Sequence, residues 1–156
     1  QADQKFMAQA LVLARQAGEL EEVPVGAVVV FQGEIISRGW NEPIRSQNPC
    51  AHAEIMALQK AATALGNYRL SGCQLYVTLE PCTMCVGAMV HARIERLIYG
   101  AQEPKAGAVV SRLQLLQAKH FNHHIKVQGG ILAESCGQLL TKFFDRRRCQ
   151  KKITRT

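Results

Sequence analysis

His52, Glu54, Cys82 and Cys85 are the residues whose types and spacing indicate chemistry. They belong to two short segments, His-Ala-Glu and Pro-Cys-Thr-Met-Cys. One imidazole and two thiols are three ligands of the kind that zinc prefers, and three protein ligands leave the fourth tetrahedral position open, as in catalytic zinc sites. Glu54 is not needed as a ligand, so its carboxylate is available for proton transfer. The residues therefore predict a catalytic site with one zinc ion per chain.

The spacing of these residues predicts that two helices begin at the metal. Cys82 and Cys85 are three residues apart, so a helix starting there places both thiols on one face, with Cβ atoms about 5 to 6 Å apart. Pro81 fits the start of such a helix. His52 and Glu54 are separated by about 200° around an ideal helix, so both reach one metal only if it lies beyond the helix N-terminus. The helix dipoles there favour thiolates.

The Cys-x-x-Cys pair by itself has two other interpretations, a redox pair and half of a structural zinc site. A redox pair has no need of His-x-Glu. A structural zinc needs a fourth ligand, from another histidine or from the remaining cysteines, and none stands at close ligand spacing. Those cysteines are Cys50, Cys73, Cys136 and Cys149.

Composition predicts one domain over residues 1–156, with a single core and no membrane span. The chain is 47% hydrophobic with a mean hydropathy of −0.06. The apolar run at 23–31, which Pro24 and Gly26 interrupt, is far too short to cross a bilayer. With no secretory leader apparent, we expect a cytoplasmic protein. In that compartment six cysteines favour metal binding and buried thiols over disulfides.

Most of the net charge of +7 lies in the C-terminal segment 142–156. This segment contains seven lysines and arginines and one aspartate, and so carries +6. A basic tail on a nearly neutral body indicates a contact with a polyanion. A solubilising C-terminal fringe is the alternative interpretation.

The pattern of apolar residues and turns predicts alternating helices and strands. We expect helices at 5–17, 52–65, 82–91 and 132–148, one or two helical turns at 113–117, and strands at 24–31, 34–40, 74–79, 96–100 and 124–127. The first two strands form a hairpin around Gln32-Gly33. The fold class is α/β, a three-layer α/β/α sandwich on a mixed five-stranded sheet. Strand 74–79 leads directly to the cysteines, which places them at the carboxyl end of the sheet, where α/β folds bind ligands.

Several segments resemble the bacterial tRNA-specific adenosine deaminases, a family of the cytidine deaminase-like zinc deaminases. His-Ala-Glu is followed 27 residues after Glu54 by Pro-Cys-x-x-Cys, which is the zinc motif of that superfamily. The further matching segments are Val-Pro-Val-Gly-Ala-Val (23–28), Gly-Trp-Asn (39–41), Ala-His-Ala-Glu-Ile-Met-Ala-Leu (51–58), Tyr-Val-Thr-Leu-Glu-Pro-Cys-x-Met-Cys (76–85), Gly-Ile-Leu (130–132) and the final Phe-Phe with arginines. The resemblance covers nearly the whole chain.

The resemblance implies a homodimeric zinc enzyme that converts the wobble adenosine of a tRNA anticodon loop to inosine. It also implies the mechanism, in which zinc activates a water and Glu54 takes its proton, delivers a proton to the ring nitrogen and helps to expel ammonia. The implied substrate-binding residues are Asn41, the backbone near Ala53, the pocket residues Val23 and Leu79, Glu103, Lys105, and the tail residues Arg146, Arg147 and Arg148. Two positions depart from the family pattern: Glu103 replaces a more frequent aspartate, and Val110 a common glycine.

Three functions fit the sequence. The first is a tRNA adenosine deaminase, the second a deaminase of free nucleosides or bases, and the third a zinc module that binds RNA without catalysis. The basic tail favours the first over the second, because a small neutral base needs no polycation. Glu54 favours an enzyme, because a structural zinc site gains nothing from a carboxylate that is not a ligand.

Overall fold

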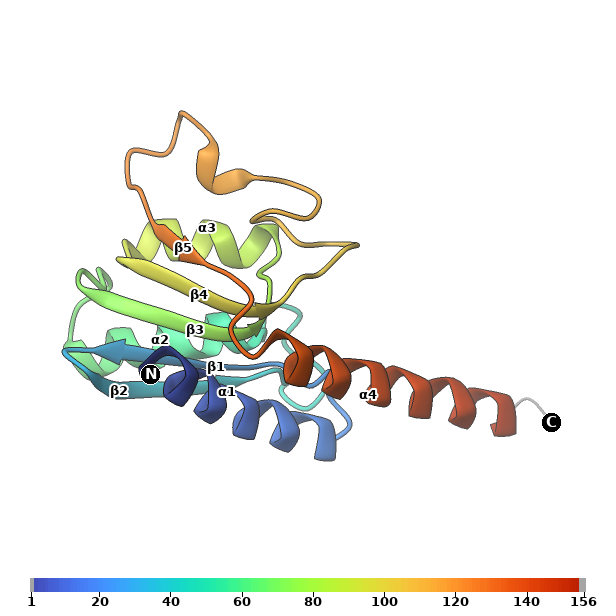
Figure 1. Ribbon diagram of the computed structural model, residues 1–156. Coiled ribbons are helices and arrows are strands. Elements are labelled where there is room, and N and C mark those ends of the chain that lie inside the picture. Colours follow the sequence, from blue (N-terminus) through green and yellow to red (C-terminus); the bar gives the residue numbers. More distant parts are fainter. Residues whose placement is uncertain (1, 155–156) are drawn as a thin grey trace.

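The computed structural model describes residues 2–154 and contains alternating helices and strands in this range (Figure 1). In chain order the elements are α1 (Ala2–Glu19), β1 (Gly26–Phe31), β2 (Glu34–Trp40), α2 (Ala53–Leu65), β3 (Cys73–Leu79), α3 (Thr83–Ala92), β4 (Arg96–Ala101), the short 3₁₀ helix η1 (Leu115–Gln117), β5 (Lys126–Gln128) and α4 (Ala133–Thr154). None of the described helices combines the length and apolar character needed to cross a membrane.

The strands form one mixed sheet in the order β2-β1-β3-β4-β5. β1 is antiparallel to both β2 and β3, whereas β3, β4 and β5 are parallel. At the turn between β1 and β2, Gln32 and Gly33 both have positive φ values, 53° and 78°. Two positive φ values are typical of the tight turns that match the twist of a hairpin. The mixed five-stranded sheet and its hairpin therefore confirm the prediction.

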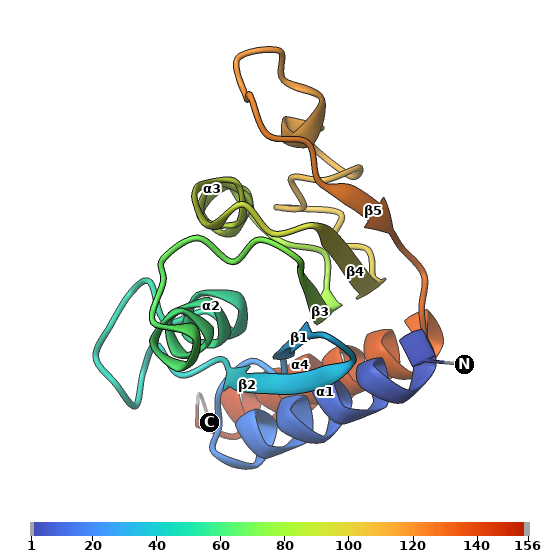
Figure 2. The same ribbon diagram turned by 90° about the vertical axis from the view of Figure 1, so that its left-hand side faces the viewer.

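Helices cover both faces of the sheet, as Figure 2 shows in a view along it. Alternate residues of β1 point to opposite faces, as the period of a strand requires. Ala27 and Val29 belong to the core shared with α2 and α3, whereas Val28 and Val30 belong to the core shared with α1 and α4. The fold is thus the predicted three-layer α/β/α sandwich.

Gly39 in β2 allows α2 to lie close against the sheet. A Cβ atom on Gly39 would be 2.4 Å from the Ala53 carbonyl oxygen and 2.6 Å from the Ala57 nitrogen. Only a residue without a side chain permits that approach. The first turn of α2, which follows His52, is positioned against β2 through this contact.

Several predicted boundaries differ from the structure, and α1, for example, spans Ala2–Glu19 rather than 5–17. β1 begins at Gly26 rather than at residue 24, because Pro24 has no N–H for the ladder. β5 is Lys126–Gln128 rather than 124–127. Before this strand, the His123 ring forms a hydrogen bond with the Ile94 carbonyl oxygen. α4 continues to Thr154, past the predicted end at 148, since no glycine or proline follows to stop it. Its C-terminal half extends beyond the rest of the molecule (Figure 1).

Candidate metal centre and active site

Two helix N-termini meet at the site, as the spacing predicted. His52 is the N-cap residue of α2 and Cys82 is the N-cap residue of α3, and both have extended backbone conformations. Neither side chain makes a capping hydrogen bond, so both are free to face the metal. Pro81 lies one residue before the cap rather than in the first turn of α3, and its carbonyl oxygen accepts a hydrogen bond from Ala108 N at 2.9 Å.

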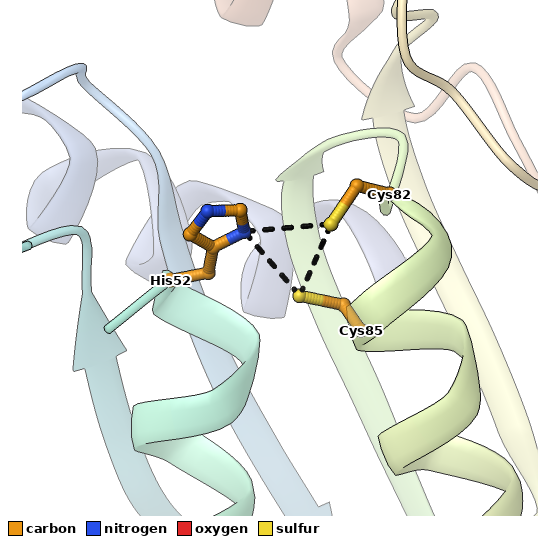
Figure 3. A group of neighbouring side chains, drawn as sticks. All are labelled: His52, Cys82 and Cys85. Atoms are coloured by element: carbon orange, nitrogen blue, oxygen red, sulfur yellow. Dashed lines mark hydrogen bonds between the residues drawn. The ribbon is translucent and has the colours of Figure 1, made fainter. Parts of the chain in front are cut away.

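The separations of the three ligand atoms fit a tetrahedral zinc ion (Figure 3). His52 Nδ1 lies 3.5 Å from Cys82 Sγ and 3.5 Å from Cys85 Sγ, and the two sulfurs are 3.8 Å apart. Tetrahedral zinc, with bonds of about 2.0 Å to nitrogen and 2.3 Å to sulfur, separates sulfur from nitrogen by about 3.5 Å and two sulfurs by about 3.8 Å. The donor set and its geometry therefore fit zinc with a fourth position left open.

The two thiols have opposite pKa shifts. The pKa of Cys82 is lowered to about 4, mainly because of the hydrogen bond between its sulfur and Cys85, with a smaller effect from the hydrogen bond with His52. The pKa of Cys85 is raised, because the hydrogen bond with Cys82 and burial both favour its protonated form. Zinc binds thiolates, so metal binding at this site would release the thiol protons that remain.

Glu54 is buried beside the ligands in the first turn of α2. Its side chain is 4% exposed, and burial raises its carboxyl pKa to about 7, although its own backbone N–H and His52 act in the opposite direction. A group with a pKa close to neutrality both takes and gives protons readily. The carboxyl is therefore suited to general acid–base work at this position.

Asn41 joins the end of β2 to the start of α2. Its Oδ1 accepts a hydrogen bond from Ala53 N at 2.9 Å, and its own N donates to the Val25 carbonyl oxygen at 3.1 Å. Ala53 is fully buried. In this arrangement Asn41 fixes the turn of α2 that contains Glu54.

Val23 and Leu79 lie at the same end of the sheet as the ligands. Both are partly buried and pack against the core of the α2 and α3 face. Leu79 is the last residue of β3, and Gly26 N donates to Thr78 Oγ1 at 3.2 Å, which places the start of β1 beside the end of β3. Apolar groups are thus available there to contact a planar base.

The loop after β4 carries Glu103 and Lys105. One carboxyl oxygen of Glu103 accepts a hydrogen bond from Lys105 N at 2.9 Å, so the glutamate shapes its own turn. Val110 has no positive φ and is 41% exposed, so a side chain is compatible with this backbone. The loop borders a pocket of about 590 Å³ lined by Cys82, Thr83, Met84, Lys105, Ala106, Ser111, Arg112 and Leu113.

Arg146 and Arg147 contact residues at and just after the C-terminal end of α1, and not the metal ligands. Arg146 Nη2 donates to the Gly18 carbonyl oxygen at 3.4 Å, and Arg147 Nη2 donates to the Glu21 carbonyl oxygen at 2.5 Å. The guanidinium of Arg148 pairs with the Asp145 carboxylate. Residues 155 and 156 of the predicted basic tail lie outside the described residues.

Two buried carboxylates that were not among the predicted site residues hold loops at this end of the sheet. Glu22 accepts hydrogen bonds from Ile44 N at 3.3 Å and Arg45 N at 2.8 Å. Glu80 accepts hydrogen bonds from the loop after β4. The available signal was the position of Glu80, a charged residue directly between a buried strand and Pro81.

Residues 1–101 match the family described as the cytidine and deoxycytidylate deaminase zinc-binding region. Among similar proteins, the tRNA-specific adenosine deaminase of Haemophilus influenzae is 51% identical over 152 residues, which cover 97% of this chain and 88% of that protein. The tRNA-specific adenosine deaminase of Bacillus subtilis is 46% identical over 153 residues, 98% of this chain and 95% of that protein.

Two solved structures share the fold. A structure from work on A-to-I editing by tRNA:A34 deaminases at the wobble position of transfer RNA has a TM-score of 0.85 and 47% identity, and the match covers 87% of this chain and 99% of that one. A guanine deaminase from Nitrosomonas europaea has a TM-score of 0.76 and 26% identity, over 90% of this chain and 83% of the other.

Proposed function

The chain belongs to the cytidine and deoxycytidylate deaminase zinc-binding family, and from that premise we propose that it deaminates adenosine to inosine at the wobble position of tRNA anticodon loops. The observation that carries the proposal is the arrangement of His52, Cys82 and Cys85 at zinc-ligand separations with the buried Glu54 beside them. It occurs in a chain that is 51% identical to a tRNA-specific adenosine deaminase over 97% of its length.

The residues of the chain divide the reaction between binding and proton transfer. His52, Cys82 and Cys85 hold the zinc ion, which lowers the pKa of a bound water toward about 7 and so supplies a nucleophile at neutral pH. Glu54 takes one proton of the water at its carboxylate and delivers it to the ring nitrogen, and then transfers the second proton of that water to the departing amine, so that adenosine and water become inosine and ammonia. General acid–base catalysis of this kind contributes about 10² to 10⁴ in rate.

The substrate contacts are part of the proposal. We assign Val23 and Leu79 to the walls of the base pocket, and Asn41 and the Ala53 backbone to the nucleotide. Glu103, Lys105 and the tail arginines contact the RNA. Support comes from the apolar character of the first pair and from the basic composition of residues 142–156. An unpaired loop base is extruded at lower cost than a base in a duplex, which suits an anticodon substrate.

We propose that the enzyme works as a homodimer through the α2 and α3 face. An apolar groove of about 370 Å³ runs along this face, and its lining consists of Ile55, Leu58, Gln59, Ala62, Tyr68, Leu70, Ala88, His91 and Ala92. A second copy of the chain that covers the groove would bury this apolar surface without altering the packing of helices on the sheet. The proposal also includes a single zinc deaminase domain over 1–156 and a cytoplasmic location, where tRNA is available.

The alternative substrate is a free nucleobase, which the similarity to a guanine deaminase favours. The deciding experiment incubates the purified protein with anticodon stem-loops that contain A or C at the wobble position, and with free adenosine, cytidine and guanine. We expect inosine from the A-containing loop and little turnover of the free compounds. Comparable turnover of a free nucleoside or base would favour the alternative. The Cys82→Ala variant, which should lose zinc by elemental analysis, is the negative control.

A further inference from the structure

Glu80 is a buried carboxylate, 2% exposed, at the junction between β3 and the metal-binding segment. It accepts five hydrogen bonds. Oε1 accepts from Glu103 N at 3.1 Å and from the Ser111 hydroxyl. Oε2 accepts from three consecutive backbone N–H groups, those of Val109, Val110 and Ser111, at 3.1, 2.8 and 3.0 Å. The carboxylate therefore holds residues 103–111, the first part of the loop that follows β4.

No lysine or arginine takes part in this arrangement, since no ion pair among residues 2–154 involves Glu80. The donors to the Glu80 carboxylate are all neutral: they are backbone N–H groups and one serine hydroxyl. Gly107 adds a steric constraint, because a Cβ atom there would lie 2.4 Å from Glu80 Cδ. The loop is thus built around the carboxylate at close range, and its conformation depends on it.

The same loop forms one wall of the pocket of about 590 Å³ beside Cys82, and the first turn of α3 forms another. Two cations, Lys105 and Arg112, line this pocket. Both are exposed, and neither enters an ion pair within the described part of the chain. Next to the metal ligand there is consequently a concave surface with two positive charges that have no acidic partner.

We propose that this pocket binds a backbone phosphate of the RNA substrate through Arg112 and Lys105, and that Glu80 is the positioning residue that holds both cations in place. The inference rests on the proposed function, which supplies the RNA. A nucleotide extruded into the metal site has a phosphate on either side, and one of them lies close to the site. The planar guanidinium of arginine suits two phosphate oxygens at once.

The first test measures the affinity of an anticodon stem-loop at several salt concentrations by a binding titration that needs no turnover. Arg112→Gln should weaken binding about 3- to 10-fold and reduce the log–log salt slope by about 0.7, the value for one phosphate contact on a single strand. The matched control is Arg38→Gln, an exposed arginine on β2 at the far edge of the sheet. If both variants have the same affinity and salt slope as the parent, the pocket binds no phosphate.

The second test asks whether Glu80 acts through the cations. In a double-mutant cycle, Glu80→Gln should weaken RNA binding. Arg112→Gln should then reduce the affinity by a much smaller factor in the Glu80→Gln background than in the parent. Zinc content should stay at one ion per chain. Independent effects that multiply in the double variant would overturn the positioning role. Should Glu80→Gln fail to fold, Ser111→Ala removes one of the five hydrogen bonds and should give a smaller coupling of the same sign.

The two proposals fail in different ways. A parent protein that binds the stem-loop but forms no inosine would refute the proposed function and leave the affinity comparison intact. A parent that forms inosine, with Arg112→Gln unchanged in affinity and salt slope, would refute the phosphate pocket alone.

Discussion

Glu54 and Glu80 are two glutamates buried at the same end of the sheet, but their carboxyl pKa values shift in opposite directions. They are 4% and 2% exposed. Burial raises the pKa of Glu54 to about 7, and the hydrogen bonds to its carboxylate do not offset this effect. Burial also acts to raise the pKa of Glu80, but the hydrogen bonds from Ser111, Val110 and Glu103 outweigh it and leave that pKa lowered.

The difference shows that burial alone does not decide what an acidic residue does. A carboxylate with several fixed donors remains an anion and organises the backbone around it. A carboxyl group with few donors changes its protonation state near neutral pH and is available for proton transfer. The two roles require opposite local structures, so substitutions at these positions should have opposite consequences.

The largest expected effect is the loss of deamination activity when Glu54 is replaced. Glu54→Gln keeps the shape of the side chain but removes proton transfer, so deamination of the stem-loop should fall by about 10² or more. Zinc content and melting temperature should stay at parental values, because the carboxylate is not a ligand and holds no loop. Activity within about tenfold of the parent would remove Glu54 from the acid–base role.

The second effect is a loss of stability at Glu80. Glu80→Gln places an –NH₂ group against backbone N–H donors and leaves buried hydrogen-bonding groups without acceptors, which costs about 1 to 3 kcal/mol. Urea unfolding should show this decrease in the free energy of unfolding, with Glu54→Gln as the comparison. A larger loss of stability in Glu54→Gln than in Glu80→Gln would contradict the assigned roles.

The third effect is a loss of stability when the packing of the loop after β4 around the Glu80 carboxylate is disturbed. Gly107→Ala should destabilise the protein by about 1 to 3 kcal/mol, because the new Cβ overlaps the Glu80 carboxylate. Gly87→Ala is the matched control, since a Cβ atom there has nothing within 4 Å and alanine favours the helix by about 1 kcal/mol. Thermal melting of the two variants should therefore shift in opposite directions. Equal shifts would indicate that loop packing around Glu80 is not tight.

The smallest effect concerns Asp3, a carboxylate that has a cation as its partner. Arg96 donates to both oxygens of Asp3, at 3.0 and 2.6 Å, and these bonds lower the pKa of the aspartate although partial burial opposes them. A lowered pKa stabilises the fold above the unfolded value of about 3.9, and this contribution is lost as the pH falls through the folded value. Both side chains are partly exposed, so Asp3→Asn should cost no more than about 1 kcal/mol.

The measurement for Asp3 is urea unfolding of Asp3→Asn and the parent at pH 7 and near pH 2.5. The difference in the free energy of unfolding should be present at pH 7 and should shrink at the lower pH. A difference that grows on acidification has the wrong sign for this ion pair and would contradict its role.

The local pattern of the sequence was sufficient to predict the zinc ligands as a set and the elements that hold them. The spacings of His-x-Glu and Cys-x-x-Cys together predicted a metal at two helix N-termini, and the helices do begin there, with His52 and Cys82 as N-cap residues. The hairpin at Gln32-Gly33 and the strand before the cysteines followed from equally local signals. Errors were confined to boundaries, such as the end of α4, where no residue stops the helix.

Contacts between distant residues, in contrast, were decided only by the tertiary structure. Glu80 bonds to residues 23 to 31 positions further along the chain, and its position after a buried strand could suggest burial but could not identify these partners. The hydrogen bonds that Arg146 and Arg147 donate to the carbonyl oxygens of Gly18 and Glu21, more than 120 positions earlier in the chain, likewise follow no local pattern, and their predicted contact with RNA stays a prediction. Periodicity and ligand spacing are properties of neighbouring residues and can be recognised in the sequence, whereas burial, pKa and loop position depend on which distant segments the fold brings together.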